Sequence, residues 1–143
     1  MKNIIFTLLI ATAFSYNTNA QDKNIPLNQI PKQITEYLNT HFPNNTVLEA
    51  SFDDHVKYKK YEIELNNKIS LEFSTEFKVT EIKSKDKLPD SVIPTAILTY
   101  VKTNYPNNTI SDWEIDKGNQ QIELNNGIDL IFNLKGEFLR VEK

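Results

Sequence analysis

Acidic side chains are the residues of this chain whose type and spacing could do chemistry. Most of them fall on the polar positions of segments in which apolar and polar residues alternate, which places them on one side of a β-sheet. The set comprises Glu49, Glu62, Glu64, Glu72, Glu81, Asp112, Glu114, Asp116, Glu123 and Asp129. The simplest interpretation is a solvated outer face, because an antiparallel sheet needs polar residues on its outer side. The alternative is an acidic docking surface for a basic partner, or a weak cation site.

The densest acidic segment is Asp112-Trp113-Glu114-Ile115-Asp116. Its carboxylates could supply oxygen ligands to calcium, but it lacks the glycine and the terminal glutamate of a calcium-binding loop. Trp113 shares the inward phase with Ile115 and is expected in the core rather than in a ligand-stacking platform. We therefore predict no metal site and no cofactor.

Catalytic residues with diagnostic spacing are missing from the sequence. His41 lies at the end of a predicted helix and His55 in a predicted hairpin, and the chain contains no cysteine. Without a second nearby histidine, each is expected at the surface or at a helix end. No nucleophile elbow, phosphate loop or dinucleotide fingerprint is present. We predict that the protein is not an enzyme, with a hydrolase of unrecognised site as the disfavoured alternative.

The charge of the chain argues against nucleic acid as a partner. The formal net charge is −3, and Lys and Arg are mixed with Asp and Glu along the sequence. No basic face is therefore available for a phosphate backbone.

The amino terminus has the layout of a secretory signal peptide. A lysine at position 2 precedes an apolar run over residues 4–14, and small residues lead to Ala20. We expect cleavage after Ala20, so residues 1–20 form the signal peptide. The run is too short to cross a bilayer, which predicts no membrane insertion of the mature chain. Without a cysteine to acylate, a periplasmic or secreted protein is expected rather than a lipoprotein.

The rest of the sequence consists of two similar repeats, over residues 25–83 and 84–143. The segment 25–47 matches 88–110 at an offset of 63, including Phe42-Pro43-Asn44-Asn45-Thr46 against Tyr105-Pro106-Asn107-Asn108-Thr109. The match then continues at an offset of 59, where Ile63-Glu64-Leu65-Asn66-Asn67 meets Ile122-Glu123-Leu124-Asn125-Asn126. The four-residue difference falls where Asp53 to Lys60 is replaced by the shorter Asp116 to Asn119, as expected for a trimmed hairpin loop.

Each repeat predicts one helix followed by four antiparallel strands. Apolar residues recur at helical spacing from Ile34 to Phe42 and from Ile97 to Tyr105, and a proline follows each stripe. Period-two alternation then predicts the strands. All three glycines lie in gaps between strands of the second repeat, and Asn126-Gly127 is a hairpin signal. Phe77 stands where the second repeat has Gly136, so we expect that turn of the first repeat to differ in shape.

These features resemble one family: an Ile/Val-Pro opening, a helix, a Phe/Tyr-Pro stop, hairpins and a Leu-Asn-Asn-Gly block with a later Phe and Lys-Gly. The sequence is similar to the PepSY-like, β-lactamase-inhibitor-like exported proteins of Bacteroidetes. The resemblance covers about residues 25–143 and implies an α+β fold. That fold would be two tandem units, each a helix on a four-stranded antiparallel sheet, in a two-layer, β-lactamase-inhibitor-like plan. One face of such a sheet stays open.

The sequence therefore predicts a non-enzymatic exported binding module that contacts a protein or peptide through the open sheet face or the hairpin loops. The alternative, implied by the resemblance, is an inhibitor or regulator of an exported protease or β-lactamase. Exposed apolar residues, acids of the open face and positions where the repeats diverge form the candidate contact surface: Tyr58, Glu62, Glu64, Phe77, Glu123, Ile131 and Phe138.

Overall fold

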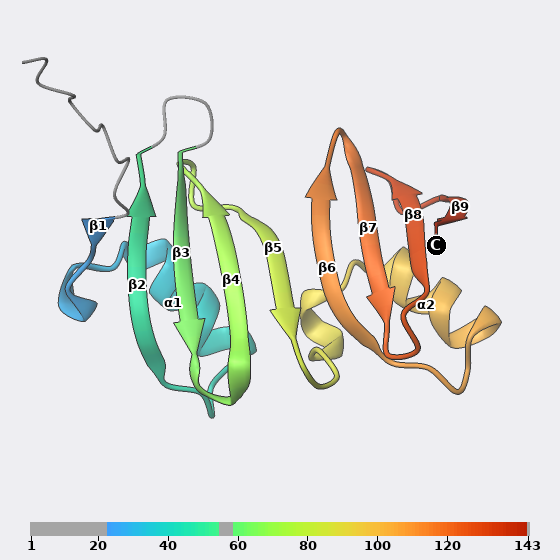
Figure 1. Cartoon of the computed structure of the whole chain (residues 1–143), viewed down its shortest axis with the longest axis horizontal. Coiled ribbons are helices and arrows are strands. Elements are labelled where there is room, and N and C mark those ends of the chain that lie inside the picture. Colours follow the sequence, from blue (N-terminus) through green and yellow to red (C-terminus); the bar gives the residue numbers. More distant parts are fainter. Residues whose placement is uncertain (1–22, 55–58, 143) are drawn as a thin grey trace, which may run out of the picture.

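The computed structural model describes residues 23–54 and 59–142, and it shows one continuous antiparallel sheet with helices on one face (Figure 1). The predicted signal peptide and Tyr58 lie outside the described residues. The strands follow one another in chain order across the sheet. They are β1 (Lys23–Asn24), β2 (Val47–Asp53), β3 (Lys60–Leu65), β4 (Ile69–Ser74), β5 (Val79–Ser84), β6 (Ile110–Asp116), β7 (Asn119–Leu124), β8 (Asp129–Asn133) and β9 (Phe138–Glu142).

Two helices repeat the same relation to the sheet. Helix α1 (Lys32–His41) precedes β2 and helix α2 (Thr95–Asn104) precedes β6. Each is introduced by a short 3-10 helix: η1 (Leu27–Gln29) precedes α1 and η3 (Asp90–Val92) precedes α2, while η2 (Asn66–Lys68) joins β3 to β4. The first unit is thus α1 with β2–β5, and the second is α2 with β6–β9. The prediction of one helix and four strands per repeat is confirmed, and β1 is an additional short strand.

The two units join through β5 and β6, which pair antiparallel over three residues. Ile82 lies opposite Trp113, with Glu81 opposite Glu114 and Lys83 opposite Asp112. The two four-stranded sheets therefore form one sheet, and their buried side chains form one core cluster. Ile82 is fully buried and Trp113 is 5% exposed, so this junction belongs to the core.

Both helices bury the apolar stripe that the sequence predicts. Ile34 and Leu38 of α1 are buried, as are Ile97 and Val101 of α2. Aromatic contacts fix each helix on its sheet, since Tyr37 meets Phe73 edge-on with ring centroids 5.5 Å apart and the second unit repeats this contact. Neither helix of the described chain is long and apolar enough to cross a membrane.

The repeated Asn-Asn-Thr segments have a structural role. The Asn45 side chain donates to Asn66 Oδ1 over 2.8 Å, and the Thr46 amide donates to the same oxygen over 3.1 Å. Asn108 and Asn125 repeat the side-chain bond at 2.9 Å in the second unit. Each motif therefore ties the start of a long strand to the turn after the next strand, which explains why these polar residues recur.

The turn between β4 and β5 has the same shape as the corresponding turn of the second unit, contrary to the expectation from the sequence. Phe77 adopts a left-handed conformation with φ of +62°, and its counterpart Gly136 has φ of +82°. The turn hydrogen bonds are also the same, because the amides of both residues donate over 2.9 Å, Phe77 to Ser74 and Gly136 to Asn133. The predicted change of shape was wrong. The Phe77 ring lies 5.6 Å from Tyr61, and this packing offsets the local backbone strain.

Candidate functional site

The open face of the sheet carries a row of four glutamates on four adjacent strands. Glu62 of β3 lies opposite Glu72 of β4, Glu72 opposite Glu81 of β5, and Glu81 opposite Glu114 of β6. Directly opposite side chains in an antiparallel sheet have Cβ atoms roughly 5 Å apart, and like charges there are destabilising. The row crosses the junction between the units, so the tertiary fold brings together acids from both repeats.

A second row runs parallel to the first and is also acidic at both ends. In the second unit Asp112, Glu123 and Asp129 lie opposite one another in turn, and the row reaches Glu142. In the first unit Glu49 lies opposite Glu64. The described open face therefore carries a large excess of carboxylates.

Two lysines neutralise part of this charge. Lys60 Nζ contacts Glu62 Oε1 at 2.8 Å and Glu72 Oε1 at 2.5 Å. Although burial lowers the pKa of Lys60, its hydrogen bonds to these two glutamates raise it above its usual value. Lys83 pairs with Glu81 and lies 3.8 Å from Asp112. Each of these two lysines therefore forms ion pairs with two carboxylates.

Asp112 is the most perturbed acid of the face. Burial raises its pKa from 3.8 to about 7, with further repulsion from Glu81, Glu114 and Glu123 that Lys83 only partly offsets. Burial and like charge also raise the pKa values of Glu72 and Glu114. The open face therefore holds carboxyl groups with raised pKa values, and a nearby cation would stabilise their ionised forms.

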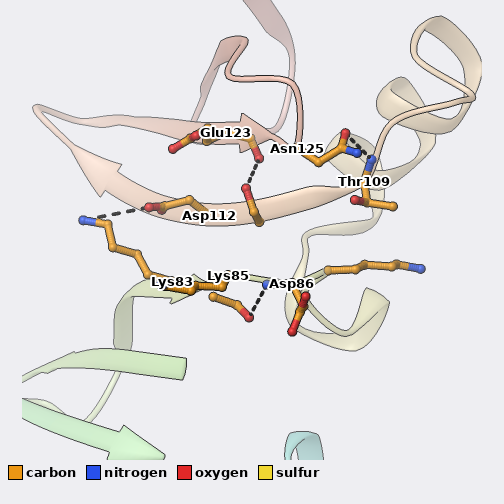
Figure 2. Close-up of a pocket in the computed structure, with 10 residues that line it drawn as sticks. Lys83, Lys85, Asp86, Thr109, Asp112, Glu123 and Asn125 are labelled. Atoms are coloured by element: carbon orange, nitrogen blue, oxygen red, sulfur yellow. Dashed lines mark hydrogen bonds and ion pairs between the residues drawn. The ribbon is translucent and has the colours of Figure 1, made fainter. Parts of the chain in front are cut away.

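A polar hollow of about 760 Å³ lies on this face, where β5 leaves the sheet and β6 enters it (Figure 2). The strands pair over only three residues, and the two chain segments diverge beyond them. Figure 2 shows Lys83 reaching toward Asp112 at one end, with Asn125 beside Thr109 at the other. The lining is Lys83, Ser84, Lys85, Asp86, Lys87, Thr109, Ser111, Asp112, Glu123 and Asn125. Charges of both signs meet here, because Lys83, Lys85 and Lys87 line the hollow together with Asp86, Asp112 and Glu123.

The described residues contain no group of His, Asp and Glu side chains that could hold a metal ion. His41 Nδ1 lies 3.0 Å from Ser91 Oγ, which links the end of α1 to η3 of the second unit. This contact is structural and joins the two units away from the acidic rows.

The structure separates the predicted contact residues into two groups. Glu62, Glu64 and Glu123 lie on the open face as expected. Phe77 instead packs against Tyr61 on the helix-covered side.

Two apolar candidates for the contact surface are less exposed than the sequence predicts. Ile131 is on the open face but only 3% exposed, because it lies between the long side chains of its cross-strand neighbours Gln121 and Arg140. Phe138 is turned inward by a β-bulge between β8 and β9 and stacks on Tyr100 with ring centroids 4.6 Å apart.

Alternation along a strand could not reveal that bulge, because a bulge shifts the phase by one residue. The exposed large apolar side chains of the described chain are different ones: Leu27, Leu48, Ile115, Leu134, Leu139 and Val141. Ile115, expected inside with Trp113, is 44% exposed at the end of β6.

Asp112→Asn is expected to change the pH dependence of stability. The folded-state pKa of Asp112 is raised, so the folded protein holds a proton that the unfolded chain releases between pH 3.8 and about 7. The contribution of Asp112 to stability therefore falls as pH rises through this window. The asparagine variant should be more stable by about 1–2 kcal/mol at pH 8, allowing for solvent screening, and nearly unchanged at pH 4.

Urea unfolding at a series of pH values measures this effect, with Asp90→Asn as a control of opposite sign. Hydrogen bonds from Lys102 and Lys87 lower the pKa of Asp90, so its contribution is present at neutral pH and lost in acid. A parallel response of the two variants would contradict the assignment of Asp112 as a repelled, buried acid.

Comparisons with known proteins agree with the repeated architecture. A family described as "Putative beta-lactamase-inhibitor-like, PepSY-like" matches the chain twice, over residues 16–81 and 79–140. A comparison with curated proteins gave no match.

Solved structures of Bacteroides proteins share the whole fold. A protein of Bacteroides thetaiotaomicron, described as a "putative calcium-regulated periplasmic protein", is 31% identical with a TM-score of 0.80, covering 85% of this chain and 97% of that one. A protein of Bacteroides vulgatus described as a "putative periplasmic protein" of the DUF2874 family is 32% identical with a TM-score of 0.80, covering 87% of this chain and 99% of that one. A second B. vulgatus protein, described as a "putative periplasmic protein of unknown function", is 26% identical with a TM-score of 0.78, covering 86% of this chain and 100% of that one.

Proposed function

Because the chain belongs to the PepSY-like, β-lactamase-inhibitor-like family, we propose that it is a non-enzymatic binding module of the periplasm. Its ligand is a basic segment of a protein or peptide, held on the open acidic face of the sheet. The periplasmic location is supported by the descriptions of the solved relatives and by the signal-peptide layout of residues 1–20.

The glutamate row from Glu62 to Glu114 is the observation that carries this proposal. A sheet that only needed solubility would gain from alternating charge, because like charges opposite one another cost stability. Lys60, Lys83 and Arg140 pair with some of the carboxylates of both rows. Among the described residues no salt bridge is formed by the others, which are Glu49, Glu64, Glu114, Glu123 and Asp129. A basic segment laid across the strands would relieve that repulsion and would be steered to the face by its charge.

Calorimetric titration with a deca-lysine peptide tests the proposal. We expect binding at about 0.02 M salt that weakens at least tenfold at about 0.3 M salt, as screening of exposed charges requires. Glu123→Lys, on the second acidic row, should weaken binding several-fold. Glu36→Lys is the matched control, because it makes the same change in net charge on exposed α1.

Equal weakening by both reversals would show that only net charge matters and would remove the open face as the site. Calcium belongs in the same titration as a competitor, because one solved relative is described as calcium-regulated. Carboxylate oxygens are calcium ligands, but the described residues form no metal-binding group, so we expect at most weak competition.

A second candidate function is inhibition of an exported β-lactamase or protease, which the description of the family favours. The open face and the polar hollow would then be the surfaces that contact the enzyme. Residual activity of a panel of purified periplasmic β-lactamases and proteases, measured with micromolar protein, tests this candidate. Full activity of every enzyme in the panel would reject it.

A further inference from the structure

Strand β9 forms an open edge of the sheet. It pairs with β8 on one side, and no other strand of the described chain lies on its outer side (Figure 1). Its exposed residues include two large apolar side chains, Leu139 at 47% and Val141 at 45%. An edge of this kind offers unpaired backbone N–H and C=O groups to another strand.

Strand β5 of the first unit is the counterpart of β9, and it shows how this strand can pair with a further strand. At the offset of 59, β9 of the second unit corresponds to β5 of the first, so Val141 stands where Ile82 stands. Both strands carry a β-bulge two residues before this position, at Thr80 and Leu139. In β5 the three residues beyond the bulge, 81–83, pair with β6 and close the junction between the units. The bulge therefore does not block pairing, and residues 140–142 are the corresponding residues of β9.

The order Arg140-Val141-Glu142 is complementary to itself in an antiparallel pairing. A two-fold axis beside Val141 would place the two Val141 side chains opposite each other, with Arg140 opposite Glu142 of the second copy on both sides. Both charge pairs are attractive, whereas the internal junction combines one attractive pair, Lys83 with Asp112, and one repulsive pair, Glu81 with Glu114. By charge, β9 fits a second β9 better than β5 fits β6.

We propose that β9 is a self-association edge, at which two copies of this chain pair antiparallel about Val141 and join their sheets into one. The symmetric contact closes on itself, so it yields a dimer and no filament. A head-to-tail contact of β9 with β2 of another copy is disfavoured, because β1 already pairs with Ser51 and Phe52 of β2 and occupies that part of its edge. Both copies would keep their helices on the same face and extend the acidic face.

Only three residue pairs meet at this edge, so the dimer should be weak. Small interfaces of this kind belong to transient complexes, and we expect dissociation in the range of about 0.1–1 mM. Sedimentation equilibrium of the protein purified from the periplasm, from about 0.01 to about 2 mM, covers that range.

A charge swap makes the test specific. Arg140→Glu alone places two glutamates opposite each other, and Glu142→Arg alone places two arginines, so each single variant should weaken dimerisation at least fivefold. The double variant R140E/E142R restores both attractive pairs and should restore dimerisation. Within one copy Arg140 Nη2 contacts Glu142 Oε1 at 3.0 Å, and melting curves of all three variants at low concentration check that folding is unaffected.

The proposal is overturned by a wild-type protein that is monomeric at the highest concentration. It is also overturned by single variants that dimerise like wild type, or by a double variant that is as weak as the singles. Val141→Lys gives an independent check, because a lysine on an edge strand opposes pairing and should abolish the dimer. A dimer that survives this change would place the interface elsewhere.

Discussion

Trp113→Ala is expected to lower the free energy of unfolding by about 3–5 kcal/mol, the largest effect of a single substitution at the junction. Trp113 is 5% exposed and lies between Ile82 of the first unit and Ile122 of the second. Its Nε1 donates to Gln120 Oε1 over 3.0 Å, and Gln120 Nε2 donates in turn to the Asn133 carbonyl over 3.1 Å. The alanine variant loses both the ring that fills the junction and the partner of buried Gln120.

Trp113→Phe separates the two contributions. The phenylalanine keeps much of the packing but leaves Gln120 Oε1 without its donor, which should cost about 1–3 kcal/mol. Urea unfolding followed by circular dichroism measures both variants, since Trp113 is the only tryptophan and its fluorescence disappears with it. A cost below about 1 kcal/mol for Trp113→Ala would show that the junction does not contribute to one cooperative core.

Gly136→Ala should cost about 2–4 kcal/mol, for two reasons that a control can separate. Gly136 has φ of +82°, which an alanine adopts only under strain. A Cβ atom at this position would also lie 2.8 Å from Ala96 Cβ on helix α2. Gly127→Ala is the matched control, because its φ is +75° but the space around it is open, so only about 1 kcal/mol is expected.

Melting temperatures and urea unfolding of the two glycine variants give the comparison. The double variant A96G/G136A removes the close contact and should recover part of the loss, although glycine in a helix costs about 1 kcal/mol itself. Equal losses for Gly127→Ala and Gly136→Ala would contradict close packing between this turn and α2.

The two repeats hold their turns with different residues. Phe77 takes the same left-handed position as Gly136 and packs its ring on Tyr61, whereas Gly136 lets the turn approach Ala96. The same backbone shape is thus reached through aromatic packing in one unit and through the absence of a side chain in the other. This difference explains how the turn keeps its shape although the residue at this position differs between the repeats.

The acidic face connects the fold to the proposed function. Its central row exists only because β5 pairs with β6 in a register that aligns Glu81 with Glu114. The same pairing creates the polar hollow, since the strands separate after three residue pairs. The junction between the units therefore positions both features of the candidate site, and a variant that opens it should alter both.

The sequence by itself determined the repeat, the two helices and the four strands of each unit, but not the additional strand β1. Pro43 and Pro106 end the helices, and the period-two pattern is local information that needs no partner. The acids on the open face were also correctly identified, because Glu62 and Glu123 follow directly from alternation.

The tertiary structure decided everything that depends on which strands pair and in what register. The bulge that turns Phe138 inward, the burial of Ile131 between Gln121 and Arg140, and the meeting of Glu81 with Glu114 all arise from the pairing between strands and not from the pattern within one strand. A one-residue shift of register moves a side chain to the other face of the sheet. The alternation of residues within one strand therefore cannot specify these contacts. The physical reason is that alternation predicts the face of a residue only within an unbroken strand, whereas bulges and the neighbours across the sheet depend on how the strands pair.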